Sequence, residues 1–118
     1  MNENNNEMAV EAVDSQIINE DNILKLMKPI EVNGRTVDTL IFDFSKIKGR
    51  VLLQCLKQAQ KEDANILVPS LSMVYQAVVA AKALGMKYDD VLELSGTDFT
   101  AVTARTSRFL SGVDRSET

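Results

Sequence analysis

The chain contains 118 residues, enough for one small domain with its own core but too few for two. Its 13 basic and 17 acidic side chains give a net charge of -4, which argues against nucleic acid as a partner, because nucleic-acid-binding domains present a basic face. Histidine is absent from the sequence, so the commonest general acid–base and the commonest metal ligand are both missing.

A single cysteine, Cys55, excludes an intrachain disulfide and favours a reducing compartment. No apolar run approaches the roughly 18 residues that a membrane span needs. The first residues, MNENNNE, lack both the basic and the apolar region of a signal peptide. We therefore expect a soluble cytoplasmic protein that does not contact a membrane.

The two ends of the chain differ in composition from its middle. Residues 1–22 form a lead rich in Asn and Glu, with few hydrophobic side chains, and such a composition is typical of a disordered segment. We expect a single domain over residues 23–112, followed by a frayed tail over residues 113–118.

A β-hairpin is predicted around Asn33-Gly34, because a type I′ turn requires positive φ at both central residues. The apolar residues on either side recur at every second position, as in strands with one buried face. A two-residue turn places Ile30 opposite Val37. In the same register Leu26 lies opposite Ile41, so that these four side chains share the face that meets the helices.

The other face of the hairpin also carries apolar side chains. Met27 lies opposite Leu40 in this register, with Phe42 beside them. Either a loop or the N-terminal lead covers these three residues, or they form an exposed contact surface for a partner. Pro29 has no backbone donor, so its strand is expected at a sheet edge.

Three main helices and one short helical turn are predicted after the hairpin. In the first, apolar residues from Ile47 to Ala59 recur at helical spacing, and Cys55 lies on that stripe as a small core side chain. The second helix, Leu71–Leu84, ends at Gly85 and is apolar on nearly all sides, so we expect it to be the central one.

In that central helix Leu71 is expected on the inner stripe, whereas Leu67 only extends the helix surface. A short helical turn follows over residues 89–94. The last helix is expected to begin at Thr97, a good N-cap, and to stop at Gly112. The predicted fold is therefore α+β, a small N-terminal β-hairpin packed against a bundle of three main α-helices.

No arrangement of residues points to catalysis. The adjacent carboxylates Glu62-Asp63 and Asp89-Asp90 have no partner base, cation or glycine-rich loop beside them. We therefore expect no catalytic residues, no metal site and no cofactor, and a protein that is not an enzyme.

Residues 71–110 also resemble a helix-turn-helix superficially, with Arg105 and Arg108 on the last helix. A recognition helix needs basic and amide side chains in its first turns, but here those turns read TDFTAVT. A small DNA-binding regulator is thus an alternative prediction.

Three stretches carry a resemblance to a known family: LKLMKPIEVNGRTVDTLIF in the hairpin, FSKIKGRVLL at its junction with the first helix, and SGTDFTAVTARTSRFL in the last helix. Over residues 24–110 the chain resembles the tail assembly chaperones of long-tailed bacteriophages and prophages. It departs from the family pattern in its long Asn-rich lead and its sparsely charged middle helix.

The resemblance implies a small α+β protein of the host cytoplasm that takes part in phage tail assembly. Such chaperones bind the long, helical, hydrophobic tape-measure protein before the tail tube polymerises around it, and they are absent from the finished particle. Further candidate partners are a frameshifted longer form of the chain itself, the tail tube protein and a second copy in a homo-oligomer. The family has no catalytic residues to carry over. A minor structural tail component is an alternative to the chaperone role.

A chaperone of this kind needs adaptable apolar contact surface, for which methionine is well suited because its side chain is flexible and polarisable. The predicted partner-binding residues are Met27, Leu40, Phe42, Met73 and Met86. The same five residues are equally compatible with an ordinary place in the core.

Overall fold

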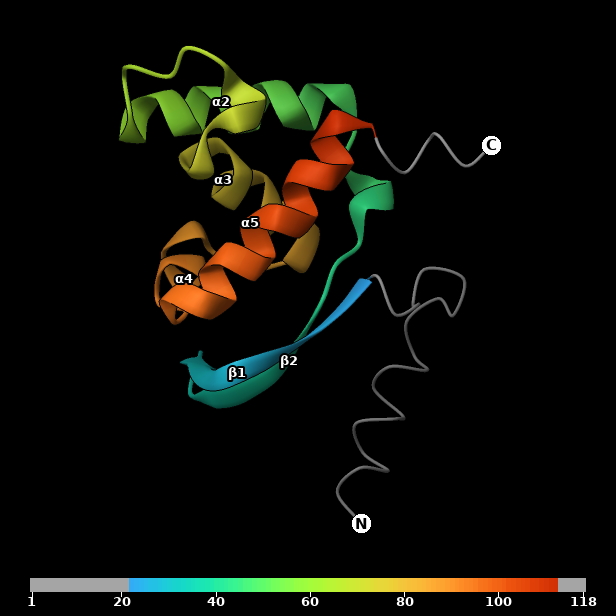
Figure 1. Cartoon of the computed structure of the whole chain (residues 1–118), viewed down its shortest axis with the longest axis vertical. Coiled ribbons are helices and arrows are strands. Elements are labelled where there is room, and N and C mark those ends of the chain that lie inside the picture. The colour runs from blue at the N-terminus through green and yellow to red at the C-terminus, as the bar shows by residue number, and fades with distance from the viewer. Residues whose placement is uncertain (1–21, 113–118) are drawn as a thin grey trace.

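The computed structural model describes residues 22–112; the predicted lead, apart from Asn22, and the predicted tail lie outside the described residues. An antiparallel hairpin comes first, and helices follow it (Figure 1). The strands are β1 (Ile23–Val32) and β2 (Arg35–Ile41). The helices are η2 (Phe44–Lys46), α2 (Gly49–Glu62), η3 (Pro69–Leu71), α3 (Met73–Leu84), α4 (Tyr88–Leu92) and α5 (Gly96–Ser111). The predicted α+β fold is confirmed.

The hairpin turns at Asn33-Gly34, as predicted. The two residues have φ values of 54° and 79°, the left-handed conformation that a type I′ turn requires and that Asn and Gly adopt most readily. The register beside the turn is also as predicted, with Ile30 opposite Val37.

Farther from the turn the predicted register is wrong, because β1 contains a wide bulge. The four residues Leu26–Pro29 face the single residue Asp38 of β2. The excess of three residues is odd, and an odd shift turns the side chains of one strand to the opposite face. Ile41 consequently lies opposite Ile23, not opposite Leu26.

This shift buries two side chains that were predicted on the outer face of the hairpin. Leu40 lies opposite Leu24, and the predicted pair with Met27 does not form. Leu40 and Phe42 are 3% and 0% exposed and belong to the hydrophobic core. In β2, the inner face of the hairpin is therefore made by odd-numbered positions on the turn side of the bulge and by even-numbered positions on its other side.

Helix α3 is the centre of the fold, as its nearly continuous apolar sequence predicts. It lies between α2 and the hairpin (Figure 1), and every residue from Tyr75 to Ala81 is buried. One core cluster joins alanines of α3 to the hairpin, α4 and α5. A second cluster packs Val78 and Val79 of α3 against Cys55 and Ala59 of α2. The central position predicted for this helix is confirmed.

The start of α3 differs from the prediction because of its cap. The helix begins at Met73, not at Leu71, since the Ser72 side chain accepts a hydrogen bond from the Tyr75 amide at 3.2 Å. Its end at Gly85 is as predicted, and this glycine has a φ of 70°.

Candidate partner-binding surface

The connection between α2 and α3 is held at both of its ends by polar contacts. After α2, the Asp63 carboxylate accepts the Asn65 amide at 3.0 Å, which closes a turn. Before α3, the buried Gln76 side chain donates to the Ser70 carbonyl at 2.7 Å. Pro69 begins the single turn of η3 between them. The connection is thus tied to the helices by these hydrogen bonds and by Ile66, which packs against the second core cluster, whereas its other apolar side chains contribute little burial.

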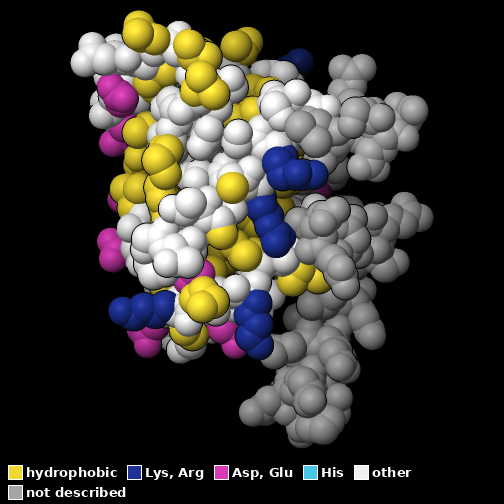
Figure 2. Space-filling view, in the orientation of Figure 1, with side chains coloured by type: hydrophobic (Ala, Val, Ile, Leu, Met, Phe, Trp, Pro, Cys, Tyr) yellow, Lys and Arg dark blue, Asp and Glu magenta, His cyan; other side chains and the backbone are white. Residues whose placement is uncertain are grey.

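Four apolar side chains of this connection and of the start of α3 are exposed, and together we call them the apolar loop patch: Leu67, Val68, Leu71 and Met73. They line an open groove of about 500 Å³, whose other walls are Asp63, Asn65, Ile66, Ser72 and Val74. Leu67 is 92% exposed and Leu71 is 74% exposed. Figure 2 shows hydrophobic side chains gathered over this part of the molecule. Clustered apolar exposure of this kind marks a contact site, whereas isolated exposed apolar residues are ordinary.

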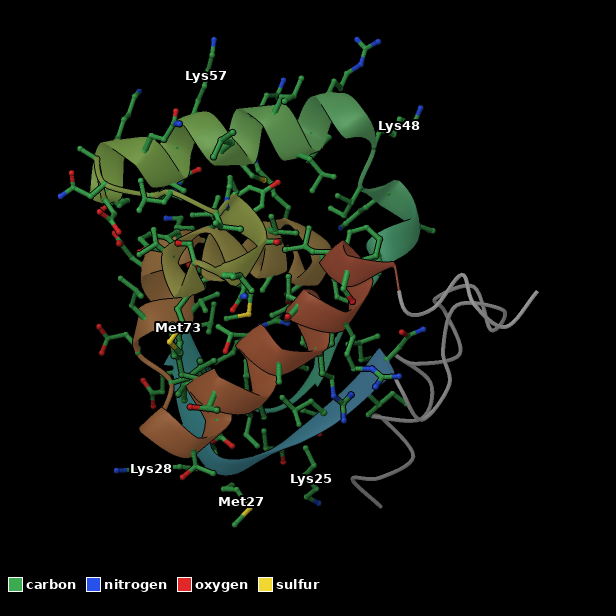
Figure 3. The ribbon with its side chains drawn as sticks, turned by 45° about the horizontal axis from the view of Figure 1, so that its top comes forward. Lys25, Met27, Lys28, Lys48, Lys57 and Met73 are labelled. Atoms are coloured by element: carbon green, nitrogen blue, oxygen red, sulfur yellow. The ribbon has the colours of Figure 1, made fainter. Side chains whose placement is uncertain are left out.

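Two of the five predicted partner-binding residues are exposed, but they do not lie together. Met73 is 48% exposed and belongs to the apolar loop patch. Met27 is 79% exposed and lies in the bulge of β1, between the exposed residues Lys25 and Lys28. Figure 3 shows Met27 pointing away from the domain at the hairpin, well separated from Met73 at the start of α3.

The other three predicted residues pack into the domain. Leu40 and Phe42 are buried for the reason of register given above, and the Phe42 ring stacks on Phe44 with 5.3 Å between ring centroids. Met86 is half-buried and packs against the same core cluster. Leu40 and Phe42 are therefore core residues and are not available at the surface, whereas Met86 keeps part of its side chain exposed.

The leucines of the patch were not among the predicted partner-binding residues. Leu71 was predicted on the inner stripe of the central helix, but it is exposed because that helix begins after it. Two local signals indicate the correct start. Val68 precedes Pro69 and therefore takes an extended conformation, and Ser72 is a favourable N-cap. Together they place Leu71 before the helix.

The carboxylate of Asp98 joins α5 to the bulge of β1. It is 1% exposed and accepts the Met27 amide at 2.9 Å and the Lys28 amide at 3.0 Å, one on each oxygen. These hydrogen bonds lower the pKa of Asp98, and the bond from the Met27 amide has the largest effect. The Ser95 hydroxyl also lowers this pKa, whereas burial of the carboxyl group raises it. The bulge amides therefore have buried partners although they pair with no strand.

The same carboxylate takes part in the cap of α5. The helix begins after Ser95 and not at Thr97 as predicted, since the Ser95 hydroxyl accepts the Asp98 amide at 3.2 Å and donates to its carboxylate at 3.1 Å. The first turn of α5 is consequently directed at β1. A helix-turn-helix protein presents this turn of its recognition helix to DNA.

Cys55 lies in the contact between α2 and α3 and is 1% exposed. Burial raises the pKa of its thiol, and the nearby Lys82 acts in the opposite direction with a smaller effect. A raised pKa keeps the thiol protonated and unreactive, so Cys55 has the core position that was predicted for it.

Within residues 22–112, no group of three or more His, Cys, Asp or Glu side chains is arranged to hold a metal ion. None of the helices in this range is long and apolar enough to cross a membrane. Comparison with known proteins gave no match, whether with family models, curated proteins or solved structures.

Proposed function

We propose that this protein is a non-enzymatic tail assembly chaperone of a bacteriophage or prophage, which acts in the host cytoplasm. Its partner is the hydrophobic tape-measure protein, which it binds before and during assembly of the tail tube. The apolar loop patch is the contact surface. Met27 in the β1 bulge is a second, separate contact point on the same molecule.

The exposure of the apolar loop patch is the observation that carries this proposal. Four large apolar side chains within residues 67–73 are 48–92% exposed, although the domain has a well-filled core. Leaving them in water forgoes about 25 cal/mol for each Å² of apolar surface that could be buried. A partner with apolar surface of its own recovers this free energy on binding.

We propose that the tape-measure protein presents a helix to this groove. A helix with an apolar stripe presents side chains at intervals of three and four residues, and these insert between apolar groups on either side of a groove. Met73 contributes a side chain that adapts to different partner surfaces. The hydrogen bonds of Ser70 and Asp63 hold the connection in one conformation, which reduces the entropy lost on binding.

The proposal is tested by co-expression with the tape-measure protein encoded beside this chain. The patch variant is Leu67→Ser/Leu71→Ser, and the matched control is Leu53→Ser/Leu92→Ser, which removes two exposed leucines outside the groove. Both variants are first shown by circular dichroism to be folded. The measurement is the amount of tape-measure protein that stays in the soluble fraction and co-purifies with each variant.

Wild type and control are expected to keep the tape-measure protein soluble, and the patch variant to lose most of this activity. A folded patch variant that keeps the partner as soluble as wild type does would show that the patch is not the contact surface. Failure of the wild-type protein to bind would remove the proposed function itself.

A further inference from the structure

The charge of this protein is divided unevenly along the chain. Residues 1–21 contain six acidic side chains and no basic one: Glu3, Glu7, Glu11, Asp14, Glu20 and Asp21. Residues 22–112 contain 12 basic and nine acidic side chains, a net charge of +3. The overall charge of -4 therefore conceals a basic domain attached to an acidic lead.

The basic side chains of the domain are concentrated along α2 and the residues that precede it. Five are exposed here, and we call them the basic face: Lys46, Lys48, Arg50, Lys57 and Lys61. No acidic residue occurs between positions 44 and 61. None of the five forms an ion pair with another residue of the described range. Figure 3 shows Lys48 and Lys57 pointing away from the domain.

The lead joins the domain close to one end of this face. The Asn22 carbonyl accepts the Phe42 amide at 2.8 Å, which fixes the first described residue beside the end of the hairpin. Helix η2 begins two residues later at Phe44, and α2 follows at Gly49. In Figure 1 the start of β1 lies below η2, on the side of the molecule where α2 begins.

The lead is long enough to follow the whole of α2. Twenty-one residues span up to about 70 Å when extended, whereas a helix of 14 residues such as α2 is only about 21 Å long. Four of its acidic side chains recur at intervals of three or four residues, from Glu3 to Asp14. On α2, Arg50, Lys57 and Lys61 are also separated by whole turns of the helix.

We propose that the acidic lead, residues 1–21, binds the basic face of the same chain and shields it from other anions. Each exposed ion pair contributes little, but six acidic side chains of the lead and five basic side chains of η2, α2 and the residue before α2 can form several pairs at once. The contact weakens as salt screens it. This inference does not depend on the tape-measure protein, because none of the five residues of the basic face lines the groove of the apolar loop patch.

The test compares ¹H–¹⁵N spectra of full-length variants. The lead variant is Glu3→Gln/Glu7→Gln/Glu11→Gln/Asp14→Asn. The control, Glu31→Gln/Asp38→Asn/Asp89→Asn/Glu93→Gln, neutralises four exposed acidic side chains of the hairpin and of the α4 region. The measured quantities are the amide shifts of residues 46–61 and their response to NaCl between about 20 mM and about 0.5 M, which shortens the screening length severalfold.

The lead variant is expected to shift the amides of the basic face more than the control does. High salt should move the wild-type amides toward the positions seen in the lead variant. Shifts no larger than those of the control would overturn the proposal. Wild-type shifts that grow with protein concentration would also overturn it, because the lead would then bind a second copy.

A fluorescent single-stranded DNA supplies an independent readout of shielding. At low salt the lead variant is expected to bind this polyanion more tightly than wild type and control. Equal affinity for all three proteins would mean that the basic face is already open in the wild type, and the proposal would fail.

Discussion

Asp98 shows how much one side chain can organise in a small domain. Its two oxygens accept the amides of Met27 and Lys28, some 70 residues away in sequence, and it also closes the cap with Ser95. A buried carboxylate is tolerated only when hydrogen bonds replace its lost hydration. Asp98 therefore stabilises the bulge of β1 and the start of α5 together.

The lowered pKa of Asp98 predicts an acid-sensitive contribution to stability. A carboxyl group whose pKa is lower in the folded state stabilises the fold fully above its unfolded-state pKa of about 4, and this stabilisation is lost as the pH falls through the folded-state pKa. The contribution of Asp98 to the melting temperature should thus be constant from about pH 7 to about pH 5 and should be lost as the pH falls below about 4.

Asp98→Asn should lower the melting temperature at neutral pH, because the amide group cannot accept both backbone donors, and it should weaken the pH dependence. Glu93→Gln, which changes an exposed carboxylate, serves as the control and should leave both properties close to wild type. Equal losses on acidification in wild type and Asp98→Asn would rule out this role.

At the scale of the elements, the sequence correctly predicts those features that depend only on residues close together in the chain. The type I′ turn at Asn33-Gly34, the helix end at Gly85 and the central apolar helix all follow from short stretches of sequence. The face of β2 that is buried does not, because the bulge is stabilised by Asp98 from the far end of the chain. Hydrophobic alternation alone cannot locate such a bulge.

The observed register of the hairpin predicts very different stability losses for substitutions at Leu40 and Met27, the two residues that the sequence pattern places opposite each other. Leu40→Ser should lower the free energy of unfolding by about 2–5 kcal/mol, since it removes a buried leucine side chain and introduces a hydroxyl group. Met27→Ser should change it by less than about 0.5 kcal/mol, because that side chain is exposed. Urea denaturation measures both values, and similar losses for the two variants would contradict the observed register.

The candidate contact surface was only partly predictable, for a related reason. Methionine content pointed to Met73, but Leu71 beside it looks like a core residue in the sequence. Whether an apolar side chain is buried depends on where its helix begins, and here the cap at Ser72 moves that start past Leu71. A shift of two residues thus converts a predicted core position into exposed surface.

At the scale of the whole molecule, α3 takes part in both core clusters, and the exposed side of α2 carries basic and polar residues together with Leu53. The apolar loop patch follows α2 at one end, whereas the chain enters the domain near its other end (Figure 1). The two proposed contacts therefore use different parts of one scaffold.

Amide hydrogen exchange of the complex with the tape-measure protein tests the central claim most directly. Binding at the apolar loop patch should slow exchange of the amides in residues 66–74 relative to the free protein, because bound apolar chains exclude water from them. The amides of β2 should exchange as before. Unchanged exchange over residues 66–74, with slower exchange confined to the hairpin or to α5, would contradict the account.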